Sequence, residues 1–123
     1  MMDKRPAWTL ILLLTVLGLP AIAGEPLVEG VEVRQEAVGT WRFDVTVRHA
    51  DEGWDHYADK WEVLTPEGEV LGERVLLHPH EHEQPFTRSL GGVTIPPGPH
   101  EVQVRAHDSV HGLGPAVTVP LGP

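Results

Sequence analysis

A ten-residue stretch decides the fold, and it reads Thr40-Trp41-Arg42-Phe43-Asp44-Val45-Thr46-Val47-Arg48-His49. Apolar side chains occupy every second position from Trp41 to Val47, and polar side chains fill the positions between them. This strict period of two is typical of a β-strand with one buried face. At about 25 cal/mol per Å² of buried apolar area, four such side chains contribute several kcal/mol to folding before chain entropy is counted. The stretch therefore predicts a strand that packs against a second sheet.

Six further segments carry strand signals, and no helical periodicity follows residue 23. These segments are Glu25–Gln35, Tyr57–Leu64, Glu69–Leu77, Phe86–Leu90, Glu101–His107 and Pro115–Leu121. Turn signals separate them, such as Thr65-Pro66-Glu67-Gly68, which has proline at its second position and glycine at its fourth. Short strands at a spacing of roughly ten residues favour a sandwich. We therefore predict an all-β domain, a single seven-stranded antiparallel β-sandwich, with Trp61 as the tryptophan buried between its sheets.

The segment Pro97-Gly98-Pro99-His100-Glu101-Val102-Gln103-Val104-Arg105-Ala106 resembles the sixth strand of fibronectin type III and related immunoglobulin-like domains. In that family a Pro-Gly turn leads to an aromatic residue and then to alternating valines. Gly112-Leu113-Gly114-Pro115, followed by Val117 and Val119, is similar to the family's last loop and strand. The resemblance implies an immunoglobulin-like sandwich, but the family's corner tyrosine would fall at His100. The chain also resembles small uncharacterised exported bacterial proteins with the same His-Pro-His and His-Asp-Ser-Val-His patterns, which implies a location outside the cytoplasm.

Residues 1–23 have the features of an export signal peptide. Lys4 and Arg5 precede the mostly apolar run Ala7–Leu19, and Ala21-Ile22-Ala23 is a small-x-small cleavage site. Cleavage there makes Gly24 the first residue of a domain that covers residues 24–123. An uncleaved membrane anchor is the alternative, but Pro20 and the cleavage pattern oppose it. We expect a periplasmic or secreted protein with no membrane span after cleavage.

The composition limits the partners and the chemistry. The formal net charge is −9, and it becomes −10 when Asp3, Lys4 and Arg5 leave with the signal peptide. Such a charge repels nucleic acid and anionic lipid but suits a cation or a basic partner. The chain has no cysteine, and both methionines precede the cleavage site, so disulfides and sulfur ligands are excluded from the mature domain. We expect a monomer that is stabilised by one core.

The segment with the most side chains that could bind a metal or take part in catalysis is Val75-Leu76-Leu77-His78-Pro79-His80-Glu81-His82-Glu83-Gln84-Pro85-Phe86. An apolar run leads into His78, His80 and His82 at every second position. If the backbone stayed extended, the three imidazoles would share one face. Pro79 could instead impose a polyproline-like turn of three residues, which would splay them.

Strand direction predicts that three polar loops lie at one end of the sandwich, because antiparallel chains reverse direction with each strand. These loops are Ala50–His56, His78–Pro85 and Asp108–Gly114. Seven of the eight histidines belong to these loops or to the adjoining strand ends, and only His100 falls at the opposite end. We call the end that carries the three loops the histidine pole.

The candidate metal ligands at this pole are His56, His78, His80, His82, His107 and His111. Candidate ligand-contacting residues are Trp54, Asp55, Tyr57, Glu81 and Asp108. His49 and His107 lie at strand ends, where histidines are more often structural than metal-ligating. Imidazole together with carboxylate suits Cu²⁺, Zn²⁺ or Ni²⁺.

The sequence thus predicts an exported, non-catalytic binding module whose histidine pole holds a divalent transition metal. The alternative is a structural or protein-interaction domain of the bacterial envelope that binds an envelope protein at the same pole and needs no metal. Plain solvated loops, in which acidic neighbours only raise the histidine pKa, would give the same pattern. No enzyme is predicted, because the adjacent residues His107, Asp108 and Ser109 point to different sides and cannot line up as a catalytic triad.

Overall fold

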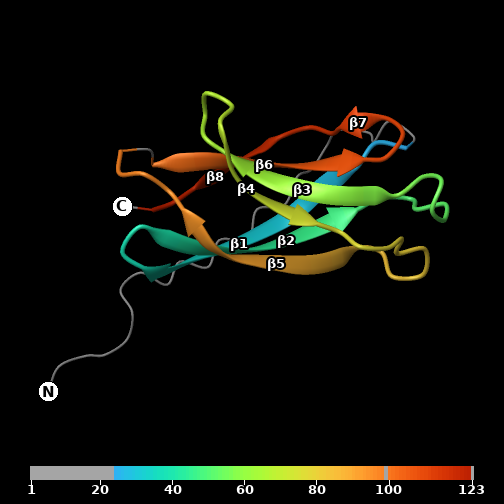
Figure 1. The fold of residues 1–123 in the computed structure, drawn as a ribbon, viewed down its shortest axis with the longest axis horizontal. Helices are drawn as coiled ribbons and strands as arrows, with labels where there is room; N and C mark the ends of the chain where they lie inside the picture. Colours follow the sequence, from blue (N-terminus) through green and yellow to red (C-terminus); the bar gives the residue numbers. More distant parts are fainter. Residues whose placement is uncertain (1–23, 99, 123) are drawn as a thin grey trace, which may run out of the picture.

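A computed structural model describes residues 24–98 and 100–122 as two antiparallel sheets packed face to face (Figure 1). The predicted signal peptide lies outside the described residues. One sheet has the order β1-β2-β5, and the other has the order β4-β3-β6-β7, with β8 also paired to β6. The strands are β1 (Leu27–Ala37), β2 (Thr40–Arg48), β3 (Ala58–Leu64), β4 (Val70–Val75), β5 (Phe86–Thr94), β6 (Glu101–Asp108), β7 (Gly112–Leu113) and β8 (Val117–Pro120). The prediction of an all-β antiparallel sandwich is confirmed.

Two differences from the sequence prediction exceed shifts of one or two residues at strand ends. Strand β5 was expected to end at Leu90, but it continues to Thr94 because a register shift against β2 absorbs the extra residue: Trp41 pairs with Val93, while Phe43 pairs with Leu90. Gly92 takes a φ of +66° within this irregular stretch, a conformation that glycine adopts without steric cost. The predicted last strand, Pro115–Leu121, is present as β8, and β7 is an additional short strand within the predicted loop Asp108–Gly114. Both pair with β6. The structure therefore has eight strand segments where seven were predicted.

The core has the two-residue period of its strands. Phe43, Val45 and Val47 of β2 are fully buried, and Trp41 packs against the core from a partly buried position. Trp61 of β3 is also fully buried, as predicted. These side chains meet the inward rows of β1, β5 and β6 between the two sheets. The central contacts of the sandwich are therefore those that the alternating pattern predicts.

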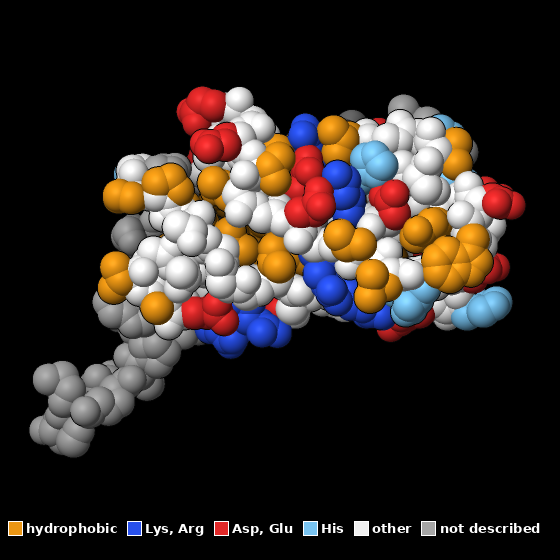
Figure 2. Space-filling model, viewed as in Figure 1, with side chains coloured by type: hydrophobic (Ala, Val, Ile, Leu, Met, Phe, Trp, Pro, Cys, Tyr) orange, Lys and Arg blue, Asp and Glu red, His pale blue; other side chains and the backbone are white. Residues whose placement is uncertain are grey.

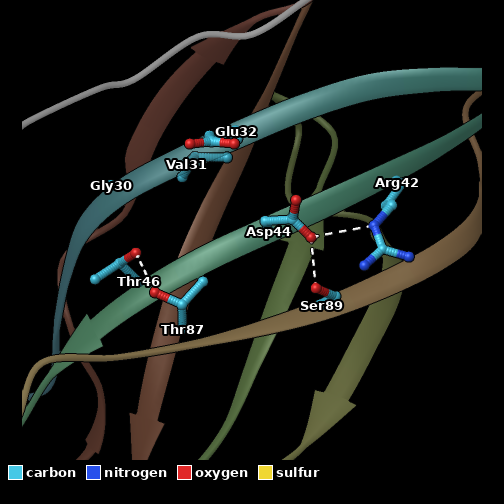
Figure 3. Close-up of a pocket in the computed structure, with 8 residues that line it drawn as sticks. All are labelled: Gly30, Val31, Glu32, Arg42, Asp44, Thr46, Thr87 and Ser89. Atoms are coloured by element: carbon cyan, nitrogen blue, oxygen red, sulfur yellow. Dashed lines mark hydrogen bonds and ion pairs between the residues drawn. The ribbon is translucent and has the colours of Figure 1, made fainter.

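The outer face of the β1-β2-β5 sheet is polar (Figure 3). Asp44 accepts hydrogen bonds from the Ser89 hydroxyl at 2.5 Å and from the Arg42 guanidinium at 3.2 Å, and the hydroxyls of Thr46 and Thr87 lie 2.8 Å apart. These side chains, paired within β2 and between β2 and β5, line an open hollow on this face. Because the polar groups pair with one another, the hollow offers few groups to a ligand.

The three predicted polar loops lie together at one end of the sandwich, on the right in Figure 1. They connect β2 to β3, β4 to β5, and β6 to β7. The β1–β2 turn and the β5–β6 crossing lie at the opposite end. The prediction of a shared loop pole is therefore confirmed, because strand direction alternates as the sequence indicated. Within the described residues, no helix has the length and apolar character that crossing a membrane requires.

Candidate metal centre

Two polar residues, His49 and Asp108, end the inward-facing rows of the two sheets. On β2 the apolar row that reaches Val47 continues two residues further to His49, which is 2% exposed. On β6 the row that reaches Ala106 continues to Asp108, which is fully buried. The Nε2 atom of His49 contacts Oδ2 of Asp108 directly, so the pair links the two sheets at the histidine pole.

A second carboxylate holds the other nitrogen of His49. Nδ1 lies 2.5 Å from Oδ1 of Asp51, which also accepts the backbone N–H of Ala58 at 3.0 Å. The other Asp51 oxygen accepts the backbone N–H of His80 at 2.6 Å. A neutral imidazole has one N–H and cannot donate to both carboxylates. In a neutral ring one of the two nitrogens keeps a lone pair, which is the form of imidazole that binds a metal ion.

Three imidazoles contact the carboxylate of Asp108. Nε2 of His56 lies 2.7 Å from its Oδ2 and Nδ1 of His111 lies 3.4 Å from the same oxygen, in addition to the contact from His49. The backbone N–H groups of Val110 and His111 donate to Oδ1 at 2.5 and 2.7 Å. We call His49, His56, Asp108 and His111 the Asp108 cluster.

The electrostatics of the cluster favour an ionised carboxylate. Burial alone would raise the pKa of Asp108, but the hydrogen bonds from the two backbone N–H groups and from His49 and His56 outweigh it and hold the pKa well below its usual range. The hydrogen bond to Glu52, 2.6 Å from Nδ1, raises the pKa of His56; partial burial opposes this, and Asp108 adds to it. The same Glu52 contact turns Nε2 of His56 toward Asp108.

The cluster has the dimensions of a metal site. One ligand atom from each of His49, His56 and Asp108 lies within 4.8 Å of the others. Ligand atoms about 2.0–2.2 Å from a tetrahedral metal lie roughly 3.3–3.6 Å apart. The two ring nitrogens would therefore move roughly 0.6–1.2 Å away from Oδ2 to admit an ion. Asp51 and Glu52 hold the opposite ring nitrogens, as the outer partners of metal-bound histidines do.

His78 and His80 lie outside the cluster. The ring of His80 stacks on Phe86 at 4.0 Å between centroids, and its Nε2 accepts a hydrogen bond from Arg88 at 3.0 Å. Burial and then the Arg88 charge lower the pKa of His80. The exposed ring of His78 lies 4.6 Å from that of His80. His80 is linked to the cluster through Asp51: its backbone N–H donates to Oδ2 at 2.6 Å, and its Nδ1 lies 4.0 Å from the same oxygen.

The remaining predicted residues are spread over the pole, and Figure 2 shows histidines together with acidic side chains toward this end of the molecule. Nδ1 of His107 lies 2.6 Å from Asp59 on the outer face of its sheet. His82, Glu81 and Asp55 are exposed. Trp54 is 67% exposed and makes an edge contact with Tyr57 at 5.6 Å between ring centroids. Of the predicted residues, the structure thus brings together His56, His111 and Asp108.

Sequence reasoning assigned His49 a structural role, although it lies at the centre of the cluster. The sequence does contain a signal that His49 is buried, because residues 41, 43, 45, 47 and 49 share one face of the strand. Asp108 has the same relation to the row of residues 102, 104 and 106. A polar residue that continues an inward apolar row must find a buried partner. Two such residues at the same end of opposite sheets indicate a buried polar site.

Comparisons with known proteins give one relative and no family. The chain is 50% identical over 72 residues to a protein of Halomicrobium mukohataei described as "Putative lipoprotein". The match covers 58% of this chain and 35% of the relative, so the chain spans about a third of the relative's length. No protein-family model and no solved structure matches the chain.

Proposed function

We propose that this protein is an exported, non-catalytic β-sandwich module that binds a divalent transition metal ion at the Asp108 cluster. The observation that carries the proposal is the convergence of three imidazole nitrogens on one oxygen of a buried carboxylate. Neutral imidazole and carboxylate together suit Cu²⁺, Zn²⁺ or Ni²⁺.

Each residue has a distinct role in this proposal. Nε2 of His49, Nε2 of His56 and Oδ2 of Asp108 bind the ion, and Nδ1 of His111 is the fourth ligand because it faces the same oxygen. Asp51 and Glu52 fix the orientation of the His49 and His56 rings. These four residues supply three imidazole nitrogens and one carboxylate oxygen, a donor set that suits a divalent transition metal.

Two observations support export. Residues 1–23 have the basic start, apolar run and small-x-small cleavage site of a signal peptide. The relative in Halomicrobium mukohataei is described as "Putative lipoprotein", and lipoproteins are a class of exported protein. We therefore propose a periplasmic or secreted location.

Isothermal titration of the purified protein with Cu²⁺ and Zn²⁺ tests metal binding. We expect a dissociation constant well below 1 mM, and a loss of affinity of at least about tenfold in His56→Ala. His107→Ala is the matched control, because His107 also pairs with a carboxylate but lies outside the cluster. Binding weaker than millimolar, or equal losses in the two variants, would refute the proposal.

A protein-contact surface at the same pole is the second candidate. Trp54, Leu77 and Val110 are exposed, at 67%, 74% and 58%, and each belongs to a different one of the three pole loops. Exposed apolar side chains gathered at one end of a domain often mark a contact with a partner. If one envelope protein crosslinks to this pole, Trp54→Ser together with Leu77→Ser should abolish the crosslink and leave metal affinity unchanged. A crosslink that survives both substitutions would exclude this surface.

A further inference from the structure

Gly24 lies against the Asp108 cluster. Its carbonyl oxygen is 3.1 Å from Nε2 of His49, so it accepts a hydrogen bond when that nitrogen is protonated. A Cβ added to Gly24 would lie 2.5 Å from Cε1 of His111 and 3.1 Å from Cε1 of His56. A side chain at this position would have to displace both rings, and the φ of +84° at Gly24 also favours glycine. The backbone of Gly24 is therefore part of the wall of the site.

Covalent geometry also limits where the nitrogen of Gly24 can lie. In any residue the backbone nitrogen is about 2.5 Å from the Cβ position, because both are bonded to the same tetrahedral Cα. The nitrogen of Gly24 is then at most about 5 Å from Cε1 of His111. Gly24 also lines an open hollow together with Ala50, Glu52, His56 and His111. The nitrogen thus lies within about 5 Å of the His111 imidazole, and it belongs to a residue that lines an open hollow.

Cleavage after Ala23 would change the chemistry of this nitrogen. In the uncut chain it is an amide, whose lone pair is delocalised into the carbonyl group and is a poor metal ligand. In the cut chain it becomes a primary amine with a free lone pair. The amine and the carbonyl oxygen of Gly24 could then bind one ion together in a five-membered chelate ring.

We propose that the α-amine of Gly24, released by signal peptide cleavage, is a ligand of the metal bound by the Asp108 cluster, and that the resulting nitrogen-rich site selects Cu²⁺ over Zn²⁺. This inference rests on the proposed function. Adding an amine to the imidazoles increases the number of nitrogen donors, and Cu²⁺ binds such donors more tightly than Zn²⁺ does. The uncut chain lacks this ligand, so cleavage during export completes the site.

A structural role for Gly24 would need only its carbonyl oxygen and its small size. One added residue before Gly24 keeps both of these features and converts the amine back into an amide. Two chains that differ only by this residue therefore separate the two roles. The comparison is practical because every described strand and every core residue lies after Gly24.

The experiment compares two chains. The first is residues 24–123, released from a fusion partner so that Gly24 has a free amine. The second is the same chain with one serine added before Gly24. Both are titrated with Cu²⁺ and Zn²⁺ and labelled with [¹⁵N]glycine for electron paramagnetic resonance of the copper form. We expect the free-amine chain to bind Cu²⁺ at least about tenfold more tightly than the extended chain and more tightly than Zn²⁺, with ¹⁵N coupling to copper only in the free-amine chain.

The outcomes distinguish this inference from the proposed function. Equal Cu²⁺ affinity in both chains with no ¹⁵N coupling would overturn the inference, and if His56→Ala still weakened binding, the Asp108 cluster would stand as the metal site. No binding by either chain would overturn both. N-terminal sequencing of the protein exported with its own residues 1–23 gives a second check, because a mature chain that begins at any residue other than Gly24 also overturns the inference.

Discussion

Replacing Asp108 with asparagine tests the cluster without changing the size of the buried side chain. The new amide oxygen can still accept the backbone N–H groups of Val110 and His111, which contact Oδ1 in the native protein. On the other side, a neutral NH₂ group replaces the carboxylate oxygen that faces His49 and His56. The substitution therefore removes the negative charge from the centre of the cluster and leaves the end of β6 otherwise intact.

The expected loss of stability follows from these contacts. Each hydrogen bond between an imidazole and a buried carboxylate contributes about 1.5–3 kcal/mol, so two of them amount to about 3–6 kcal/mol. Breaking a buried ion pair by removing one partner costs about 3–5 kcal/mol. Because His49 would keep Asp51 as a partner, we expect Asp108→Asn to lower the free energy of unfolding by about 3–5 kcal/mol.

Urea denaturation at neutral pH with a chelator present measures this loss for the metal-free protein. Asp59→Asn is the matched control, because Asp59 also contacts a histidine, His107, but both side chains are about 30% exposed. Such a pair contributes less than about 1 kcal/mol. A loss below about 1 kcal/mol in Asp108→Asn, equal to that in the control, would refute the conclusion that a buried charged network links the two sheets.

Three further predictions follow from the described contacts. The folded-state pKa of Asp108 lies below its ordinary value of 3.8, so the ionised carboxylate stabilises the fold above that pH. In urea titrations, the difference in the free energy of unfolding between the native protein and Asp108→Asn should therefore shrink as the pH falls below about 4. Arg88→Met should raise the pKa of His80 in an NMR titration but leave it below 6.5, because burial, the larger cause of its depression, remains; an unchanged pKa would contradict the Arg88 contact. Gly114→Ala should destabilise the fold by about 1–3 kcal/mol in thermal melts, because the added Cβ would clash with the backbone oxygen of Pro26, and an unchanged melting temperature would contradict that close approach.

The sequence by itself determined the class of fold and the end of the molecule at which the three histidine-bearing loops lie. The alternation from Trp41 to Val47 predicts a buried face whether or not the partner sheet is known, because successive side chains of a strand point to opposite sides. Strand direction then assigns the loops to ends, since each antiparallel strand reverses the chain. The extra residues of β5 beyond Leu90 were missed because Gly91 and Gly92 are typical of a loop unless a bulge holds them in the sheet.

Only the tertiary structure decided which histidines meet. The pattern His78-x-His80-x-His82 concentrates imidazoles in the sequence, yet Arg88 and Phe86 hold His80 away from the cluster. His49 and Asp108 are 59 residues apart and meet because their two sheets pack face to face. A two-residue period fixes the side of the sheet to which a side chain points, but the register and packing of the sheets fix what it touches. Those depend on the whole core and cannot be computed from one strand at a time.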